Sequence, residues 1–194
     1  MKALSYLTIR IVFFIILVAA PILSSAQEDN PSISDTHPQL EIAFDYQHQS
    51  GIASNQFAVW IEDASSALVK TLYATRFTAT GGWQKRPACL PEWVTAAQPD
   101  ALSSEAVDAI TGATPSGGRL HYVWDGRDQN GNRLPAGTYR YVVEGNLRWD
   151  NRVVYSGKIE LGGPLQTSRP QPEYAGDAEQ ERSMITDVVA TYTP

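Results

Sequence analysis

The chain has 194 residues, a formal net charge of −6 and a pI of about 5.0. This acidic balance argues against binding to nucleic acid or to an anionic membrane surface, because both select basic patches. Cys89 is the only cysteine, so no disulfide can form within the chain and the fold must be held by packing.

The N-terminus has the pattern of a secretory signal peptide over residues 1–26. Lys2 and Arg10 precede an apolar run at 11–20, and small residues close the segment at Ala26. The run is shorter than the roughly 20 apolar residues of a spanning helix, although a retained membrane anchor is the alternative. There is no cysteine near the cleavage point, so a lipoprotein is excluded. Cleavage leaves 168 residues, so we expect a periplasmic or secreted protein whose mature form does not span the membrane.

A polar lead at 27–38, with two prolines, is predicted to be flexible, and residues 39–193 are predicted to form one domain. Seven segments in this domain have the composition and alternation of β-strands. They are 40–46, 57–63, 68–74, 120–124, 138–147, 152–161 and 185–192. Seven strands joined mostly by short turns predict an all-β fold, an Ig-like antiparallel β-sandwich with one partly helical insertion.

The period-two alternation also predicts which side chains face the core of the sandwich. On this pattern Glu144 faces solvent, next to an inward-facing Val143. The full inward set is predicted to be Phe44, Val59, Ile61, Leu72, Val123, Tyr141, Val143 and Ile159.

The insertion at 76–118 interrupts the strand pattern. Within it, residues 91–97 can form a helix with proline in the first turn, and residues 103–108 can form a second. Most connections between elements have about 2 to 6 residues, and long ordered insertions tend to carry function. Cys89 lies in a loop of this insertion, where a small buried hydrophobe is preferred over a free thiol or an interchain disulfide.

The insertion ends in the segment Asp108-Ala109-Ile110-Thr111-Gly112-Ala113-Thr114. It resembles the acceptor motif of the bacterial flavin transferases that work outside the cytoplasm: Asp, two variable residues, Ser or Thr, Gly, Ala, then Thr or Ser. The matching positions are Asp108, Thr111, Gly112, Ala113 and Thr114. The resemblance implies that Thr114 is joined to FMN by a phosphoester bond. Gly112 and Ala113 would keep the backbone slim enough to enter another enzyme's active site. The alternative is an ordinary loop, because Gly and Pro are common in loops.

A second motif runs from Trp124 to Tyr139 and contains Asp125-Gly126, Asn130-Gly131 and Pro135-Ala136-Gly137. It resembles the Ig-like module of flagellar hook-assembly proteins. Asn130-Gly131 predicts a tight turn. The acidic and amide side chains suggest a calcium site, but the glycine is misplaced for an EF-hand and no glutamate closes the loop. Turn capping by these side chains is therefore the preferred interpretation.

Over about residues 39–193 the chain resembles the predicted periplasmic proteins of domain of unknown function family 2271. The resemblance rests on Val59-Trp60-Ile61-Glu62-Asp63, Val69-Lys70-Thr71-Leu72, Trp93, Asp108 to Thr114, Gly137-Thr138-Tyr139 and Val188-Val189. Such proteins tend to be encoded beside PepSY-type membrane proteins and flavin transferases. This implies a flavin transferase and a membrane redox protein as partners.

Two functions follow from these patterns. In the first, the sandwich carries FMN on Thr114 and exchanges electrons with a membrane partner, while the protein orients and tunes the cofactor. Trp83, Trp93 and Trp124 could stack on the flavin, although packing in the core is the preferred interpretation for each. In the second, no cofactor binds and the domain is an accessory, assembly or adhesion module of the cell envelope. The sequence contains no conventional catalytic constellation or zinc-ligand spacing.

Overall fold

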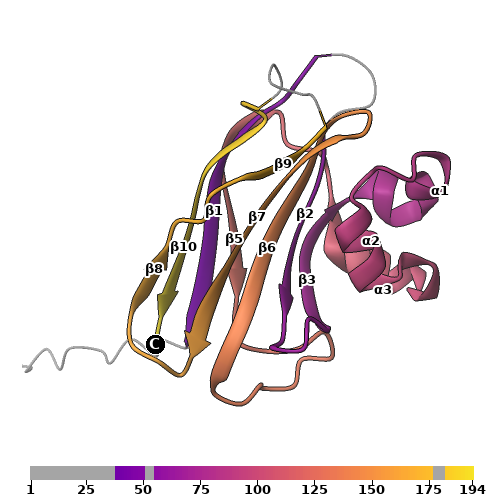
Figure 1. Ribbon diagram of the computed structural model, residues 1–194. Helices are drawn as coiled ribbons and strands as arrows, with labels where there is room; N and C mark the ends of the chain where they lie inside the picture. The colour runs from indigo at the N-terminus through magenta and orange to yellow at the C-terminus, as the bar shows by residue number, and fades with distance from the viewer. Residues whose placement is uncertain (1–37, 51–54, 177–181) are drawn as a thin grey trace, which may run out of the picture. The chain divides into compact units, whose positions relative to one another are not determined.

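The computed structural model describes residues 38–50, 55–176 and 182–194. The predicted signal peptide and nearly all of the predicted lead lie outside these ranges. The described residues form two β-sheets that face each other, with helices gathered on one side (Figure 1). The strands are β1 Gln39–Gln47, β2 Gln56–Glu62, β3 Leu68–Thr75, β4 Thr111–Gly112, β5 Gly117–Trp124, β6 Gly137–Arg148, β7 Asn151–Leu161, β8 Gln166–Ser168, β9 Glu173–Ala175 and β10 Ile185–Thr193.

The predicted all-β sandwich is confirmed. One sheet has the order β5-β1-β10-β8 and the other β4-β3-β2-β6-β7-β9. Every strand pair is antiparallel except β3 with β4. Each of the seven predicted strands is present. The three additional strands, β4, β8 and β9, have only two or three residues and too little sequence to show a period.

The main core lies between the two sheets. Six of the eight residues predicted to face inward are buried there, and Leu72 is partly buried against the same cluster. The prediction for Val123 is wrong, because its side chain is 52% exposed. Val123 pairs with Glu41 of β1, so both lie on the outer face, while Tyr122 and Trp124 on either side contact the core. The residues of β5 that face the core are therefore one position away from the predicted one. Such a shift exchanges the two faces of a strand.

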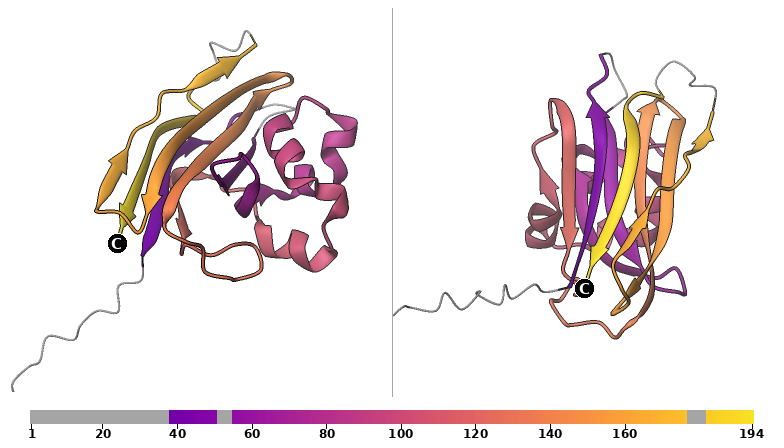
Figure 2. Two further views of the ribbon diagram at one scale, coloured as in Figure 1. Left: turned by 60° about the horizontal axis from the view of Figure 1, so that its bottom comes forward. Right: turned by 90° about the vertical axis from the view of Figure 1, so that its left-hand side faces the viewer.

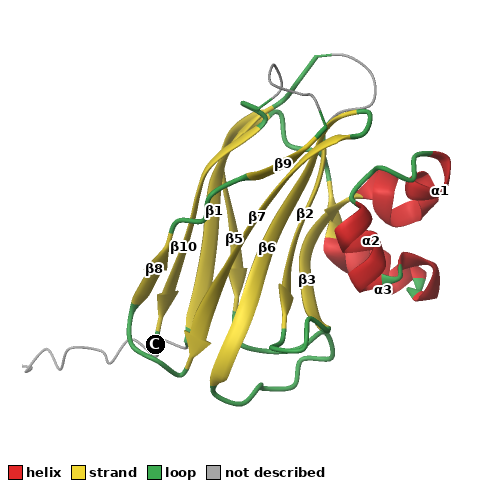
Figure 3. Ribbon diagram, in the orientation of Figure 1, coloured by secondary structure: helices red, strands yellow, loops and turns green. Residues whose placement is uncertain are grey.

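The helical part of the chain packs on the outer face of the larger sheet. It consists of η1 Thr78–Gly82, α1 Trp83–Lys85, α2 Pro91–Ala97, η2 Pro99–Ala101 and α3 Ser104–Ile110. Figure 2 shows these helices together on one side of the sandwich, and Figure 3 shows them as a single group beside β3. The two predicted helices are confirmed as α2 and α3. A second core fills the space between helices and sheet, where Trp60 and Val142 point from the strands toward Leu90 and Trp93.

This second core explains why β2 and β6 are apolar on both faces. Along β2, Val59 and Ile61 belong to the core between the sheets, while Ala58 and Trp60 belong to the core under the helices. Cys89 is fully buried in the second core, with its sulfur 3.1 Å from the hydroxyl of Thr78. Burial raises the pKa of the Cys89 thiol, which fits its predicted role as a small hydrophobe.

The predicted solvent exposure of Glu144 is wrong, because the helices cover its face of β6. Its side chain is fully buried, and its carboxylate accepts the backbone N–H of Trp93 at 2.9 Å and that of Glu92 at 3.3 Å. These N–H groups belong to the first turn of α2, where Leu90 at the N-cap has no side-chain acceptor to offer. Glu144 therefore caps a helix that lies about 50 positions away in the sequence. A pattern of neighbouring residues cannot predict such a cap.

Glu144 should make the stability of the domain depend on pH. Burial raises its pKa to about 7, from 4.5, although the N–H groups of α2 partly oppose this. Glu92 also raises the pKa, and Arg152 lowers it. The folded protein therefore binds more protons than the unfolded chain between these values, so the free energy of unfolding should fall as pH rises from about 4.5 to about 7.

Chemical denaturation of wild type and the Glu144→Gln variant across this pH range measures the effect. The amide does not titrate, so the fall should be much smaller in the variant. Equal pH slopes for the two proteins would show that Glu144 is not the titrating group.

Candidate functional site

The acceptor-like motif spans three kinds of local structure. Asp108 lies in the last turn of α3, Thr111 and Gly112 form β4, and Ala113 and Thr114 lie in the loop that leads to β5. Strand β4 runs parallel to the end of β3, where Gly112 pairs with Thr75. Since β4 is an end strand of the larger sheet and follows α3 directly, the motif is fixed at the edge of that sheet.

Helix α3 begins where the sequence predicts. The hydroxyl of Ser103 accepts the N–H of Ala106 at 3.2 Å, and Glu105 follows in the first turn. Serine at the N-cap and an acid in the first turn both stabilise a helix start. The helix ends at the buried Ile110, and Thr111 then adopts an extended conformation to enter β4. The capped start of α3 and the buried Ile110 at its end hold Asp108 to Ile110, the helical part of the motif, in place.

The two hydroxyl groups of the motif lie in different environments. The Thr111 oxygen is buried and has no hydrogen-bond partner among the described residues. Thr114 is exposed, in a loop without helix or strand structure. Gly117 and Gly118, which follow, both have a positive φ that strains other residues. Of the two hydroxyl groups, only that of Thr114 is accessible to another protein in the folded state.

Gly112 is not required by the fold. A Cβ placed on it would lie 3.5 Å from the ring of Tyr73, which is an ordinary van der Waals contact, and its φ is outside the left-handed region. Ala113 is exposed as well. The small residues in the centre of the motif therefore have no packing explanation.

Asp108 forms an ion pair with Arg76, the residue that follows β3, at 2.9 Å. Both side chains are about two-thirds exposed, so the pair contributes at most about 1 kcal/mol to stability. Both residues belong to the lining of a pocket of about 410 Å³ between η1, η2 and α3. The sequence alone does not indicate that Arg76 belongs to this site, because Arg76 lies 32 residues from Asp108.

The tryptophans proposed as flavin partners are mostly part of the cores. Trp93 and Trp124 are almost fully buried, and their indole N–H groups donate to Thr71 and to the carbonyl of Arg127. Trp83 is only partly buried, in α1. Core packing is therefore the role of Trp93 and Trp124, as preferred from the sequence.

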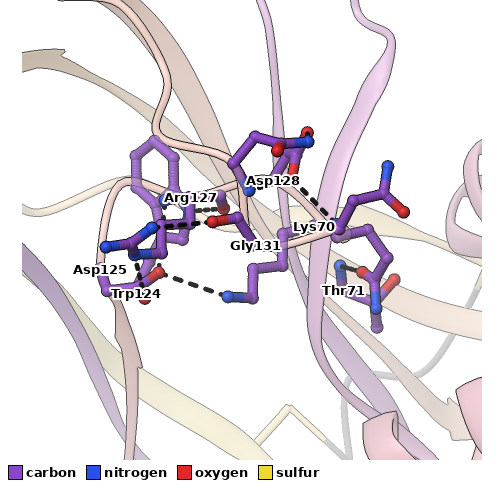
Figure 4. A network of polar contacts seen from close by, with 10 residues as sticks. Lys70, Thr71, Trp124, Asp125, Arg127, Asp128 and Gly131 are labelled. Atoms are coloured by element: carbon purple, nitrogen blue, oxygen red, sulfur yellow. Dashed lines mark hydrogen bonds and ion pairs between the residues drawn. The ribbon is translucent and has the colours of Figure 1, made fainter.

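The loop after Trp124 is held by its own side chains (Figure 4). The Asp128 carboxylate accepts the backbone N–H groups of Asn130 and Asn132 at 2.9 and 2.8 Å, and Asp125 forms an ion pair with Lys70. Within the described ranges, no group of three or more His, Cys, Asp or Glu side chains could hold a metal ion. These bonds are turn capping by the loop's own side chains, as preferred from the sequence.

The turn in this loop is displaced by one residue from the predicted position. The N–H of Gly131 donates to the carbonyl of Asp128 at 3.1 Å, so Gln129 and Asn130 are the central residues and Gly131 takes the positive φ. Gln129 also bonds the backbone of β3, at Val69 and Thr71. The loop thus covers part of the edge of β3 that β4 leaves uncovered, which gives it a structural role.

The chain matches the sequence model of DUF2271, described as a predicted periplasmic protein, over residues 38–178. It belongs to this family. The DUF2271 match covers all strands except β10 and includes the acceptor-like motif. The periplasmic location predicted from the sequence is thereby confirmed. No curated protein matches the chain, and no solved structure matches it. None of the helices in the part that the structure describes has the length and apolar content to cross a bilayer.

Proposed function

We propose that this DUF2271 protein is an extracytoplasmic carrier of covalently attached FMN, held on Thr114, that exchanges electrons with a membrane redox partner. The observation that carries the proposal is the contrast between the two motif hydroxyl groups: that of Thr114 is exposed in a loop, while that of Thr111 is buried. The exposed hydroxyl is the one that the motif assigns as the attachment point.

The small residues of the motif support the same function. Since the fold does not require glycine at position 112, a reason for its small size lies outside the folded domain. Access by a modifying enzyme supplies one, because that enzyme must bring an activated phosphoryl group to the Thr114 oxygen. Larger side chains at positions 112 and 113 would hinder this approach.

Attachment would be a phosphoryl transfer from a flavin adenine dinucleotide donor bound by the flavin transferase. The Thr114 Oγ forms a bond to the phosphorus of the FMN half, the bond between the two phosphates breaks, and AMP leaves. The hydroxyl proton passes to a base of the transferase. In such reactions positioning and charge neutralisation account for most of the catalysis, so the acceptor has only to present its oxygen. Bound FMN would supply electron transfer, and the sandwich would orient it.

The test is the intact mass of the exported protein after co-expression with an active extracytoplasmic flavin transferase. We expect the mass to rise by one FMN minus water, with the adduct on Thr114 by peptide mapping. A control substrate labelled in the same cells shows that the transferase is active. An unmodified protein beside a labelled control would reject the proposal.

The second candidate is a cofactor-free Ig-like accessory module of the envelope. It is favoured by the loop after Trp124, whose turn and β3 contacts are structural and whose sequence is similar to the hook-assembly module. The mass measurement separates the two candidates, because an accessory module would carry no adduct.

A further inference from the structure

We propose that the pocket beside the motif receives the isoalloxazine ring of FMN linked to Thr114, with Arg76 at its rim as the cation for the phosphodiester. This inference rests on the proposed function and adds the site in which the ring is held.

The pocket has the size and chemistry for such a ring. Its volume of about 410 Å³ lies in the range of about 300–1,000 Å³ found for small-molecule sites. Leu102 and Val107 give it an apolar wall. Its polar groups include Thr80, whose hydroxyl donates to the Arg76 carbonyl, and Gln84, whose amide donates to Asp100. A flavin ring has the same division, with an apolar dimethylbenzene end and a polar pyrimidine end.

The pocket is within reach of the attachment point. Arg76 follows Thr75 directly, and Thr75 pairs with Gly112, which lies two residues before Thr114. Chain connectivity therefore limits the distance between the Cα atoms of Arg76 and Thr114 to about 16 Å. The ribityl phosphate chain of FMN spans about 10 Å, and the ring extends further. An FMN on Thr114 can thus bring its ring to the part of the pocket that Arg76 and Asp108 line.

Arg76 supplies the charge opposite to that of the linkage. A phosphodiester on Thr114 keeps one negative charge, and Arg76 is the cation among the lining residues, which also include the acids Asp100 and Asp108. Its contact with Asp108 uses one guanidinium nitrogen at 2.9 Å, while a guanidinium has five N–H donors. Arg76 can therefore hold Asp108 and a phosphate oxygen together. In this arrangement Asp108, the first residue of the motif, positions Arg76 next to the phosphodiester on Thr114, the last residue of the motif.

The test measures how readily iodide quenches the fluorescence of the attached flavin. In the labelled wild-type protein, quenching should be several-fold less efficient than for free FMN, because the pocket shields the ring. The Ser104→Phe variant places a bulky side chain in the pocket from an exposed position of α3, and should bring quenching close to that of free FMN.

The matched control is Thr95→Phe. Thr95 is also exposed, on α2, and lines a different groove with Pro91 and Ala96. This variant should behave as wild type. A labelled wild-type protein whose flavin is quenched as easily as free FMN, or a Ser104→Phe variant with unchanged quenching, would overturn the ring site and leave the attachment in place. Absence of the FMN adduct would instead reject the proposed function, and the ring site with it.

Discussion

Replacing Thr114 with alanine should abolish flavin labelling of the exported protein. The substitution removes the nucleophilic oxygen, and without it no phosphoester can form. The fold should not suffer, because Thr114 is exposed and lies in a loop, where substitutions usually change stability by less than about 0.5 kcal/mol. In-gel flavin fluorescence and intact mass, after co-expression with the transferase, measure the result.

Two further variants make the assignment specific. Thr114→Ser keeps a hydroxyl and should retain much of the labelling. Thr111→Ala should also retain it, because the Thr111 oxygen is buried and the transferase cannot reach it in the folded protein. That oxygen has no hydrogen-bond partner among the described residues, so its removal should cost little stability. Loss of labelling in Thr111→Ala with Thr114→Ala still labelled would move the attachment to Thr111.

Replacing Val143 with aspartate should unfold the domain. Val143 is fully buried in β6, in the core between the two sheets, and it pairs with Val59 of β2 and Tyr155 of β7. Aspartate there would place a charge without a partner in an apolar environment. We expect a loss of about 4 kcal/mol or more, which is a large part of the 5–15 kcal/mol that stabilises a typical domain.

The structure provides a matched control for this change. Val123 is also a valine in a strand, but its side chain lies on the outer face of β5. Val123→Asp introduces the same charge at an exposed position and should leave most of the stability intact. Thermal unfolding, monitored by circular dichroism, compares the stability of the two variants. Similar melting temperatures would mean that the orientation of β5 or of β6 is wrong.

The sequence predicted the fold well where a strand has one polar face. The alternation in β1 and β7 located both strands, and Pro91 located the start of α2. The short strands β4, β8 and β9 were missed, because they are held by pairing with longer strands rather than by a pattern of their own. A sequence window has no access to such pairing.

Glu144 and Arg76 show why the site was only partly predictable. A charged residue in an alternating strand normally faces water, but at Glu144 the helices close over that face and use the carboxylate as a cap. Arg76 became part of the site through contact with Asp108, far along the chain. The motif itself was visible because its residues are consecutive. The groups around it depend on how distant segments pack, and local propensity does not encode that.

The pairing of β1 with β10 has a consequence for the order in which the protein is made. Gln39, near the start of the domain, pairs with Thr193, and β10 lies between β1 and β8 in its sheet. The smaller sheet therefore cannot close until β10 has been synthesised and has crossed the inner membrane. Pairing of such distant segments is also slow. The Thr114 loop leaves the ribosome some 70 residues ahead of β10, so it reaches the periplasm while the sandwich is still open. Periplasmic chaperones thus meet this segment first as an extended chain.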